Sequence, residues 1–147
     1  MPAHPFSIRL CNWEEARPEA RRIRELVFVR EQGVPLELEW DEQDAHCDHA
    51  LAYAAAGVAV GTGRLLPDGH IGRMAVLKEW RGKGVGALLL RALLERARLR
   101  RHEQVRLNAQ IDAAGFYRRY GFEVSGPEFM EAGIAHVPMR RDLSRVC

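Results

Sequence analysis

A glycine-rich segment between an apolar strand and a long amphipathic helix constrains this chain more than any other part of its sequence. The predicted strand covers residues 71–77, and the helix follows the segment RGKGVG, which begins at Arg81. Peptide N–H groups in the first turn of a helix have no intrahelical acceptor, and the helix dipole gives them partial positive charge. Because glycine lets an anion approach the backbone closely, this turn predicts a phosphate site.

Two other phosphate-binding loops share part of this pattern. A P-loop requires Ser or Thr after its Gly-Lys pair to hold magnesium, whereas Lys83 is followed by Gly84. A dinucleotide-binding fingerprint would need its third glycine one residue later, and the acid expected about 20 residues further on is at best Glu103. A purely structural alternative is that the glycines make a tight turn beside solvated basic side chains.

The spacing Arg-x-x-Gly-x-Gly, which begins at Arg81, resembles the pyrophosphate loop of the GCN5-related N-acetyltransferases (the GNAT family), which bind acetyl-coenzyme A. The segment QIDAAGFYRRYGF, at residues 110–122, is similar to a second signature of that family, in which a tyrosine precedes a Gly-Phe pair. Here Tyr117 stands four residues before Gly121, and the two signatures occur in the family's order. One residue departs from the pattern, because Gln110 stands where the family usually has asparagine.

The resemblance implies a fold and an activity. The expected fold class is α/β (α+β): a GNAT-like, mixed and mostly antiparallel central sheet with a splayed parallel strand pair and flanking helices. A single acetyltransferase domain would span residues 1–147, and the segments VREQGVP and EAGIAHVPM suggest a small bacterial single-domain subgroup. The implied activity transfers an acetyl group from acetyl-coenzyme A to a primary amine of a small molecule or a protein. The residues expected to contact the coenzyme are Met74, Ala75, Val76, Arg81, Gly82, Lys83, Gly84, Val85, Gly86, Ala87 and Gln110.

Acyl transfer from a thioester needs a base for the amine, a donor for the oxyanion and a proton for the departing thiolate. Backbone N–H groups of residues 74–76 are the candidates for the oxyanion. Tyr117 is the candidate for the proton donor, although a tyrosine on an apolar helix face can also be an ordinary core side chain. His136 is the first candidate for the base, because an imidazole changes charge between about pH 5 and 8. Glu31 and Glu131 are alternatives, as is a chain of water molecules.

Composition argues against several other classes of protein. The 147 residues carry a net charge of +2 from 22 basic and 20 acidic side chains, without a basic stripe interleaved with aromatics, so no nucleic-acid partner is expected. The cysteines, Cys11, Cys47 and Cys147, are odd in number and lack zinc-ligand spacing, so we expect neither disulfides nor a metal. We expect a cytoplasmic protein without a membrane partner, because MPAHPF lacks leader features and no apolar run approaches a membrane span. The sequence leaves open whether the chain forms a homodimer.

The first half of the chain predicts a strand, a helix and a hairpin. Residues 6–10 predict the strand, and either Asn12 or the pair 17–18 predicts the start of the helix. The side chains expected on its buried face are Ile23, Leu26 and Val27. Residues 49–56 and 58–66 predict an antiparallel hairpin, which a Pro-Asp-Gly turn connects to the strand before the glycine loop.

The second half predicts a right-handed crossover. The helix after the glycine loop has apolar side chains at helical spacing, and residues 105–110 form a strand parallel to 71–77. Asp112 is expected to cap a further helix, which ends at Gly121. The last strands are expected at residues 122–124 and 136–140.

Charged residues outside the two signatures leave alternatives open. Residues 36–48 carry six carboxylates and no sustained period, which predicts either a solvated loop or a rim that attracts a cationic amine. Arg64 and Arg73 flank the turn before the strand 71–77. Surface positions explain both arginines, though either could reach a substrate anion.

Two rival functions remain beside the acetyltransferase. A non-catalytic module that binds or senses acyl-coenzyme A would need the loop but no general acid, so Tyr117 distinguishes it from an enzyme. A nucleotide-dependent oxidoreductase is disfavoured by the position of the third glycine. No pattern in the sequence identifies the acceptor, or indicates whether acyl groups other than acetyl are used.

Overall fold

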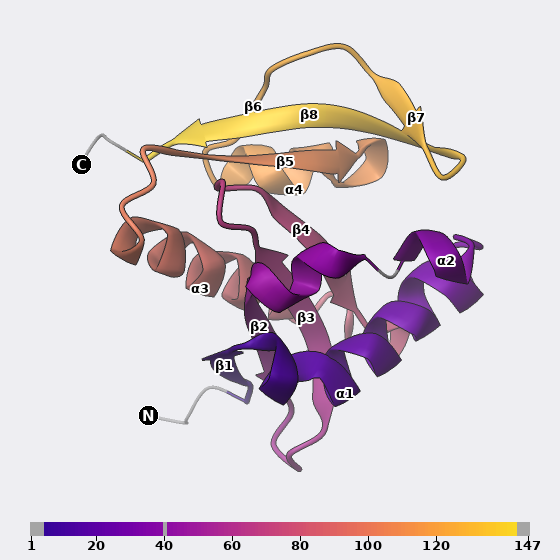
Figure 1. Ribbon diagram of the computed structural model, residues 1–147. Helices are drawn as coiled ribbons and strands as arrows, with labels where there is room; N and C mark the ends of the chain where they lie inside the picture. The colour runs from indigo at the N-terminus through magenta and orange to yellow at the C-terminus, as the bar shows by residue number, and fades with distance from the viewer. Residues whose placement is uncertain (1–4, 40, 144–147) are drawn as a thin grey trace.

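The computed structural model describes residues 5–39 and 41–143, so that Cys147 lies outside the described residues. Its strands form two sheets, one below the other in Figure 1. The lower sheet is antiparallel and contains, in spatial order, β1 (Ser7–Cys11), β2 (Asp48–Tyr53), β3 (Ala59–Leu65) and β4 (Ile71–Val76). The upper sheet contains β5 (Gln104–Gln110), β8 (Ile134–Asp142) and β6 (Glu123–Val124), with β7 (Phe129–Glu131) also paired to β8.

Helices cover both faces of the lower sheet. The α-helices are α1 (Trp13–Arg24), α2 (Leu36–Glu39), α3 (Val85–Leu99) and α4 (Ala114–Arg119). A π-helix, Glu25–Glu31, continues α1, and short 3₁₀ turns occupy Glu42–His46, Lys78–Trp80 and Ile111–Ala113. The expected hairpin is confirmed, since β2 pairs antiparallel with β3.

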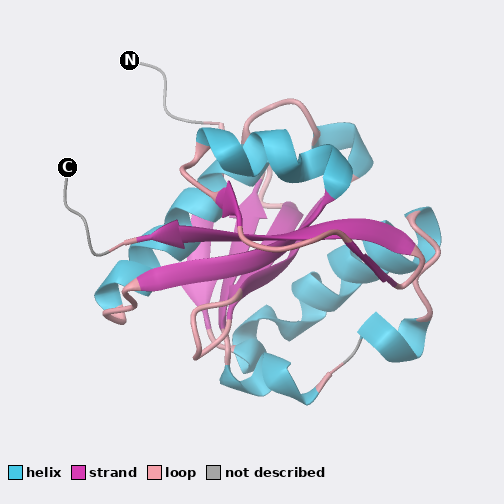
Figure 2. Cartoon of the chain, turned by 90° about the horizontal axis from the view of Figure 1, so that it is seen from above, coloured by secondary structure: helices cyan, strands magenta, loops and turns pink. Residues whose placement is uncertain are grey.

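The two sheets meet at one isolated parallel bridge, between His70 and Arg106. At this point the N–H of Arg106 donates to the carbonyl of Gly69 at 3.1 Å. Beyond the bridge, β4 and β5 belong to different sheets, and Figure 2 shows β5 and β8 as two long strands lying across the lower sheet. This confirms the expected splayed parallel strand pair, which opens toward the ends of the two strands at Val76 and Gln110.

The helix α3 packs on β2 and β3 more closely than ordinary side chains would allow. A Cβ atom added to Gly61 would lie 2.9 Å from the Cδ1 of Leu89, and one added to Gly63 would lie 3.0 Å from the Cδ1 of Leu93. The glycines of β3 therefore let the helix approach the strand. The buried side chains of α3 are Val85, Leu89, Leu90, Leu93, Leu94 and Ala97.

The expected burial of Leu26 is wrong. Asn12 caps α1 as one alternative predicted, accepting a hydrogen bond from the N–H of Glu15 at 3.0 Å, and Ile23 is buried. From Glu25 onward the helix takes the wider π turn, which changes the direction of the following side chains. Leu26 is therefore 40% exposed, whereas Val27 is buried.

Two other expectations differ from the structure. Asp112 does not cap α4, because the chain first makes the 3₁₀ turn Ile111–Ala113 and no side chain caps the helix. The short strand β7 is not among the expected elements, because it has three residues, pairs only with β8 and is too short to show an apolar period.

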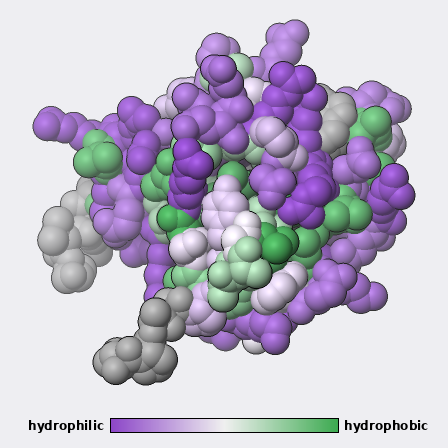
Figure 3. All heavy atoms as spheres, turned by 90° about the horizontal axis from the view of Figure 1, so that it is seen from below, coloured by the Kyte–Doolittle hydropathy of each residue, from purple (hydrophilic) through white to green (hydrophobic). Residues whose placement is uncertain are grey.

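Within residues 5–39 and 41–143, no helix is both long enough and apolar enough to cross a membrane. The face seen from below is largely hydrophilic, with hydrophobic side chains gathered near its centre (Figure 3).

Candidate active site

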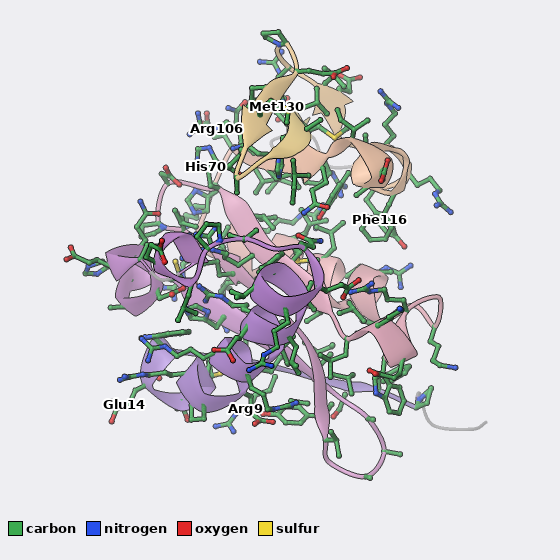
Figure 4. The ribbon with its side chains drawn as sticks, turned by 90° about the vertical axis from the view of Figure 1, so that its right-hand side faces the viewer. Arg9, Glu14, His70, Arg106, Phe116 and Met130 are labelled. Carbon is green, nitrogen blue, oxygen red and sulfur yellow. The ribbon has the colours of Figure 1, made fainter. Side chains whose placement is uncertain are left out.

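A cleft of about 1280 Å³ opens where the two sheets diverge. Its wall includes all of the expected coenzyme contacts except Lys83, together with Tyr117, Glu131 and His136. In Figure 4, His70 and Arg106 lie where the sheets meet, and Phe116 lies on α4 at the other side of the opening. The fold therefore gathers residues from the glycine loop, from the helix α4 and from the hairpin β7–β8 around one space.

The glycine loop presents unpaired peptide N–H groups to this cleft. Gly82 and Gly84 have positive φ angles of 76° and 85°, a conformation that glycine adopts readily. The first N–H of α3 with an acceptor inside the helix is that of Leu88, which bonds to the carbonyl of Gly84 at 3.2 Å. No side chain caps α3, so the N–H groups before Leu88 remain available to an anion.

Arg81 anchors the start of this loop. Its guanidinium forms two hydrogen bonds with Glu31, at 2.6 and 2.7 Å, and its Nε donates to the carbonyl of Val76 at 2.9 Å. The hydrogen bond from Arg81 is the main cause that lowers the pKa of Glu31. A carboxylate held in this way is a poor base, so Glu31 is removed from the candidates for that role.

The strand β4 turns one N–H group toward the opening beside this anchor. Leu77 donates its N–H to a carbonyl of β3 at 2.9 Å, and N–H groups alternate in direction along an antiparallel strand. The N–H of Val76 therefore points away from β3, into the gap between β4 and β5. Ala75 pairs with β3, so its N–H points the other way.

The side chain of Gln110, at the end of β5, forms hydrogen bonds with that of Gln32, a contact that no local sequence pattern predicts. Its Nε2 donates to the Oε1 of Gln32 at 3.0 Å, and the Nε2 of Gln32 donates back at 3.4 Å. Both residues line the cleft, and Gln32 directly follows the π-helix. The amide pair thus connects the helical wall of the cleft to the upper sheet.

Tyr117 is buried in the wall of the cleft, with 9% of its surface exposed. Its ring makes edge contacts with Phe116 and Phe122, whose ring centroids lie 5.1 and 5.9 Å away. Burial raises the pKa of Tyr117 to about 12. The phenol therefore keeps its proton throughout the neutral pH range.

His136 and Glu131 come together on the hairpin β7–β8. Ala132 and Gly133, both with positive φ, make the tight turn that aligns the two strands. The Nδ1 of His136 lies 2.7 Å from the carbonyl oxygen of Ile134, and its Nε2 lies 3.7 Å from a carboxylate oxygen of Glu131. The two candidate bases that line the cleft are therefore neighbours.

A buried network of arginine and aspartate side chains lies beside another part of the cleft. Arg64, for which a surface position was expected, is only 5% exposed and lies 2.8 Å from both Asp41 and Asp44. Asp44 also binds the buried Arg24 at 2.9 Å, and Asp41 lies 3.3 Å from Arg73. The surface expectation fails because two carboxylates cover Arg64 and offset the free-energy cost of burying its charge.

Residues 36–48 were expected to form either a solvated loop or an acidic rim, and ion pairs contradict both interpretations for three of the carboxylates. Hydrogen bonds from Arg64 lower the pKa of Asp41 to about 2, so this carboxylate stays charged within the network. Asp48 is bound by Arg96 at 3.1 Å and by Arg100 at 2.8 Å. Asp41, Asp44 and Asp48 therefore form neither a solvated loop nor a free acidic rim.

Within the described ranges, no group of three or more His, Cys, Asp or Glu side chains could hold a metal ion.

A family model described as an acetyltransferase (GNAT) domain matches residues 27–143. The chain belongs to the GNAT acetyltransferase family. Among its GNAT relatives, the uncharacterized N-acetyltransferase YjcF of Bacillus subtilis is 40% identical over 133 residues, which cover 88% of this chain and 94% of YjcF.

Solved structures agree with the GNAT fold. The structure of an acyl-CoA N-acyltransferase from Pseudomonas aeruginosa has a TM-score of 0.82 and 30% identity, and the match covers 92% of this chain and 99% of that one. A GNAT acetyltransferase from Elizabethkingia anophelis, solved with acetyl-CoA bound, has a TM-score of 0.72 over 96% of this chain and 100% of that one. At 16% identity this second likeness concerns the fold alone.

The GNAT cleft also contains residues that sequence reasoning missed. Phe28 and Gln32 come from the π-helix and the turn after it, and Arg91 and Arg119 come from α3 and α4. Helical spacing does not reveal the first two, because the π-helix disturbs the period. The two arginines look like ordinary exposed helix residues until the fold places α3 and α4 around one opening.

Removing the Arg81–Glu31 pair is expected to weaken coenzyme A binding to this GNAT protein only modestly. An exposed ion pair contributes about 1 kcal/mol or less, so Glu31→Gln should raise the dissociation constant by about fivefold at most. Arg81→Gln, which also removes the bond to Val76, should have the larger effect. Calorimetric titration measures both. Tighter binding in Glu31→Gln would show that Glu31 withholds Arg81 from the phosphate instead of anchoring the loop.

Proposed function

We propose that this protein transfers an acetyl group directly from acetyl-coenzyme A to a primary amine, and that residues 1–147 form a single acetyltransferase domain. The observation that carries this proposal is the composition of one cleft wall. Anion-binding peptide groups, a protonated phenol and a histidine–carboxylate pair all line the same space. A module that only bound coenzyme A would need the first of these and neither of the others.

The residues present fit acetyl-coenzyme A, which supplies the thioester when bound. A Cβ atom added to Gly82 or Gly84 would meet no described atom within 4 Å, so the space beside the loop is open to a phosphate. The unpaired edge of β4 can hold the extended pantetheine arm as an added strand would be held.

The proposed reaction forms a bond from the amine nitrogen to the acetyl carbon and breaks the bond from that carbon to sulfur. The N–H of Val76 is proposed to donate a hydrogen bond to the oxyanion that develops after the first bond forms and before the second breaks. Tyr117 is proposed to give its proton to the departing thiolate, and its high pKa ensures that the proton is present.

His136 is proposed as the base that removes a proton from the amine. A carbonyl oxygen can only accept a hydrogen bond, so the contact with Ile134 assigns the ring proton to Nδ1 and leaves Nε2 of the neutral imidazole as the acceptor. Glu131, 3.7 Å from Nε2, would stabilise the imidazolium that results. Glu131, the other candidate for the base, would then support His136 and not accept the proton itself.

His136→Gln is expected to change the pH dependence of the reaction. In the wild type, kcat/KM for the amine should rise with pH, because a base accepts a proton only in its unprotonated form. The variant should lose that dependence and fall in rate by about a hundredfold or more. A pH profile of thiol release measures both effects. Glu131→Gln, the paired control, should keep the dependence; a dependence that also persists in His136→Gln would assign it to another group.

A screen of primary amines with acetyl-coenzyme A, followed by detection of free thiol, tests the proposed activity. Stabilisation against heat by coenzyme A but not by NAD would support the donor, because a ligand that binds only the native state raises its melting temperature.

A further inference from the structure

Two arginines line the part of the cleft that precedes the proposed oxyanion site along β4. Arg64 comes from β3 and Arg73 from β4, and both belong to the cleft wall. Since β4 runs from Ile71 toward the glycine loop, Arg73 lies on the order of 10 Å before Val76. We call Arg64 and Arg73 the arginine end of the cleft.

The carboxylates that hold these arginines do not belong to the cleft wall. Asp41 contacts both guanidiniums, and Asp44 contacts that of Arg64, but neither aspartate lines the cleft. Among the described residues of the wall, Glu131 supplies the only carboxylate, on the hairpin that carries His136. The arginine end therefore presents guanidiniums to the cleft without a carboxylate beside them in the wall, whereas the hairpin β7–β8 presents the carboxylate of Glu131.

The backbone at Arg73 has an unusual conformation. Its φ of 51° lies in the left-handed region, which is uncommon for residues other than glycine. The pairing of β3 with β4 shifts register at this point, between Thr62 and Arg64. Strained conformations of this kind persist where the surrounding structure holds them, and they cluster at ligand-binding sites.

We propose that the arginine end binds an anionic group of the acceptor, so that the substrate is a small amine that also carries a carboxylate or a phosphate. A guanidinium binds either group through paired N–H donors. The amine of such a molecule would face His136 and Glu131. This inference rests on the proposed acetyl transfer, and it replaces the cationic acceptor that the acidic segment suggested.

Calorimetric titration of the full chain saturated with coenzyme A tests the anion site without turnover. The probes are N-acetyl amino acids and their decarboxylated counterparts, such as N-acetylphenylalanine and N-acetylphenethylamine, which differ only in the carboxylate. The wild type should bind the carboxylated member about tenfold to a hundredfold more tightly. N-acetyl phosphoethanolamine, compared with N-acetylethanolamine, tests whether phosphate is preferred.

Variants of Arg73 test whether the preference for the carboxylated probe comes from the arginine end. Arg73→Asn should abolish it, and asparagine tolerates the positive φ better than most residues. Arg73→Lys, which keeps the charge, should retain part of it. The control is Arg17→Gln, at an exposed arginine of α1 outside the cleft, which should behave like the wild type.

Three results would overturn the proposal: equal binding of the two probes, a carboxylate preference that survives in Arg73→Asn, or tighter binding of a cationic probe such as N-acetylputrescine. A separate assay follows thiol release from acetyl-coenzyme A with the corresponding free amines. If no thiol is released while the Arg73-dependent preference remains, the anion site stands and the acetyl transfer is refuted.

Discussion

Tyr117→Phe is expected to lower kcat by about a hundredfold to ten-thousandfold while leaving the affinity for acetyl-coenzyme A unchanged. The substitution removes only the hydroxyl, which the proposed reaction needs when the thiolate departs. The ring contacts with Phe116 and Phe122 remain, so the wall of the cleft keeps its shape. Steady-state kinetics with an accepted amine, combined with calorimetric titration of coenzyme A, separate the two effects.

A matched control for Tyr117 lies outside the cleft. Tyr53, at the end of β2, is half-buried and does not line the opening, so Tyr53→Phe should leave kcat unchanged. If Tyr117→Phe is as active as the wild type, Tyr117 is a core aromatic side chain and another group supplies the proton. If the wild type itself binds coenzyme A and acetylates no amine, the rival reading of a non-catalytic binding module gains support.

Gly84→Val is expected to raise the dissociation constant of coenzyme A by about a hundredfold or more. The new side chain would meet no described protein atom within 4 Å, so it would occupy the space assigned to the phosphate. Loss of two charge-assisted hydrogen bonds at about 1.5 kcal/mol each accounts for that factor. Calorimetric titration of the folded variant measures the affinity.

The backbone strain of this variant has its own control. Valine disfavours the positive φ at Gly84, which should also lower the free energy of unfolding by about 1–2 kcal/mol. Gly57, in the turn between β2 and β3, has a φ of 81° and equally open surroundings. Gly57→Val should therefore lose similar stability and keep full affinity. Unchanged affinity in Gly84→Val would show that the phosphate binds elsewhere.

Local patterns in the sequence predicted the parts of this fold that depend on neighbouring residues. The glycine loop, the helix α3 and the hairpin β2–β3 follow from turn residues and apolar spacing, and the structure confirms each of them. The same holds for the helix end at Gly121, whose φ of 87° suits a glycine. Two signatures about one helix and one strand apart were enough to indicate the family.

Contacts between distant residues could not be predicted in this way. Arg64 looked like a surface residue because its partners, Asp41 and Asp44, lie at least 20 positions away and belong to a segment without period. Gln32 and Gln110 are 78 positions apart, and the sequence around either residue does not indicate that the two side chains are in contact. Leu26 was misplaced because helical spacing assumes an α turn, whereas a π turn begins one residue before it.

The divergence of the two sheets has a consequence for the solubility of the folded chain. Unpaired strand edges normally invite other chains to add to them, which is a common route to aggregation. Here the facing edges of β4 and β5 lie inside the cleft, with the glycine loop at one end and the hairpin β7–β8 beside them. Because the two edges face each other across the cleft and not outward, a neighbouring sheet has no outward edge to join there. The fold thus turns two unpaired edges toward the proposed coenzyme site instead of toward the outer surface.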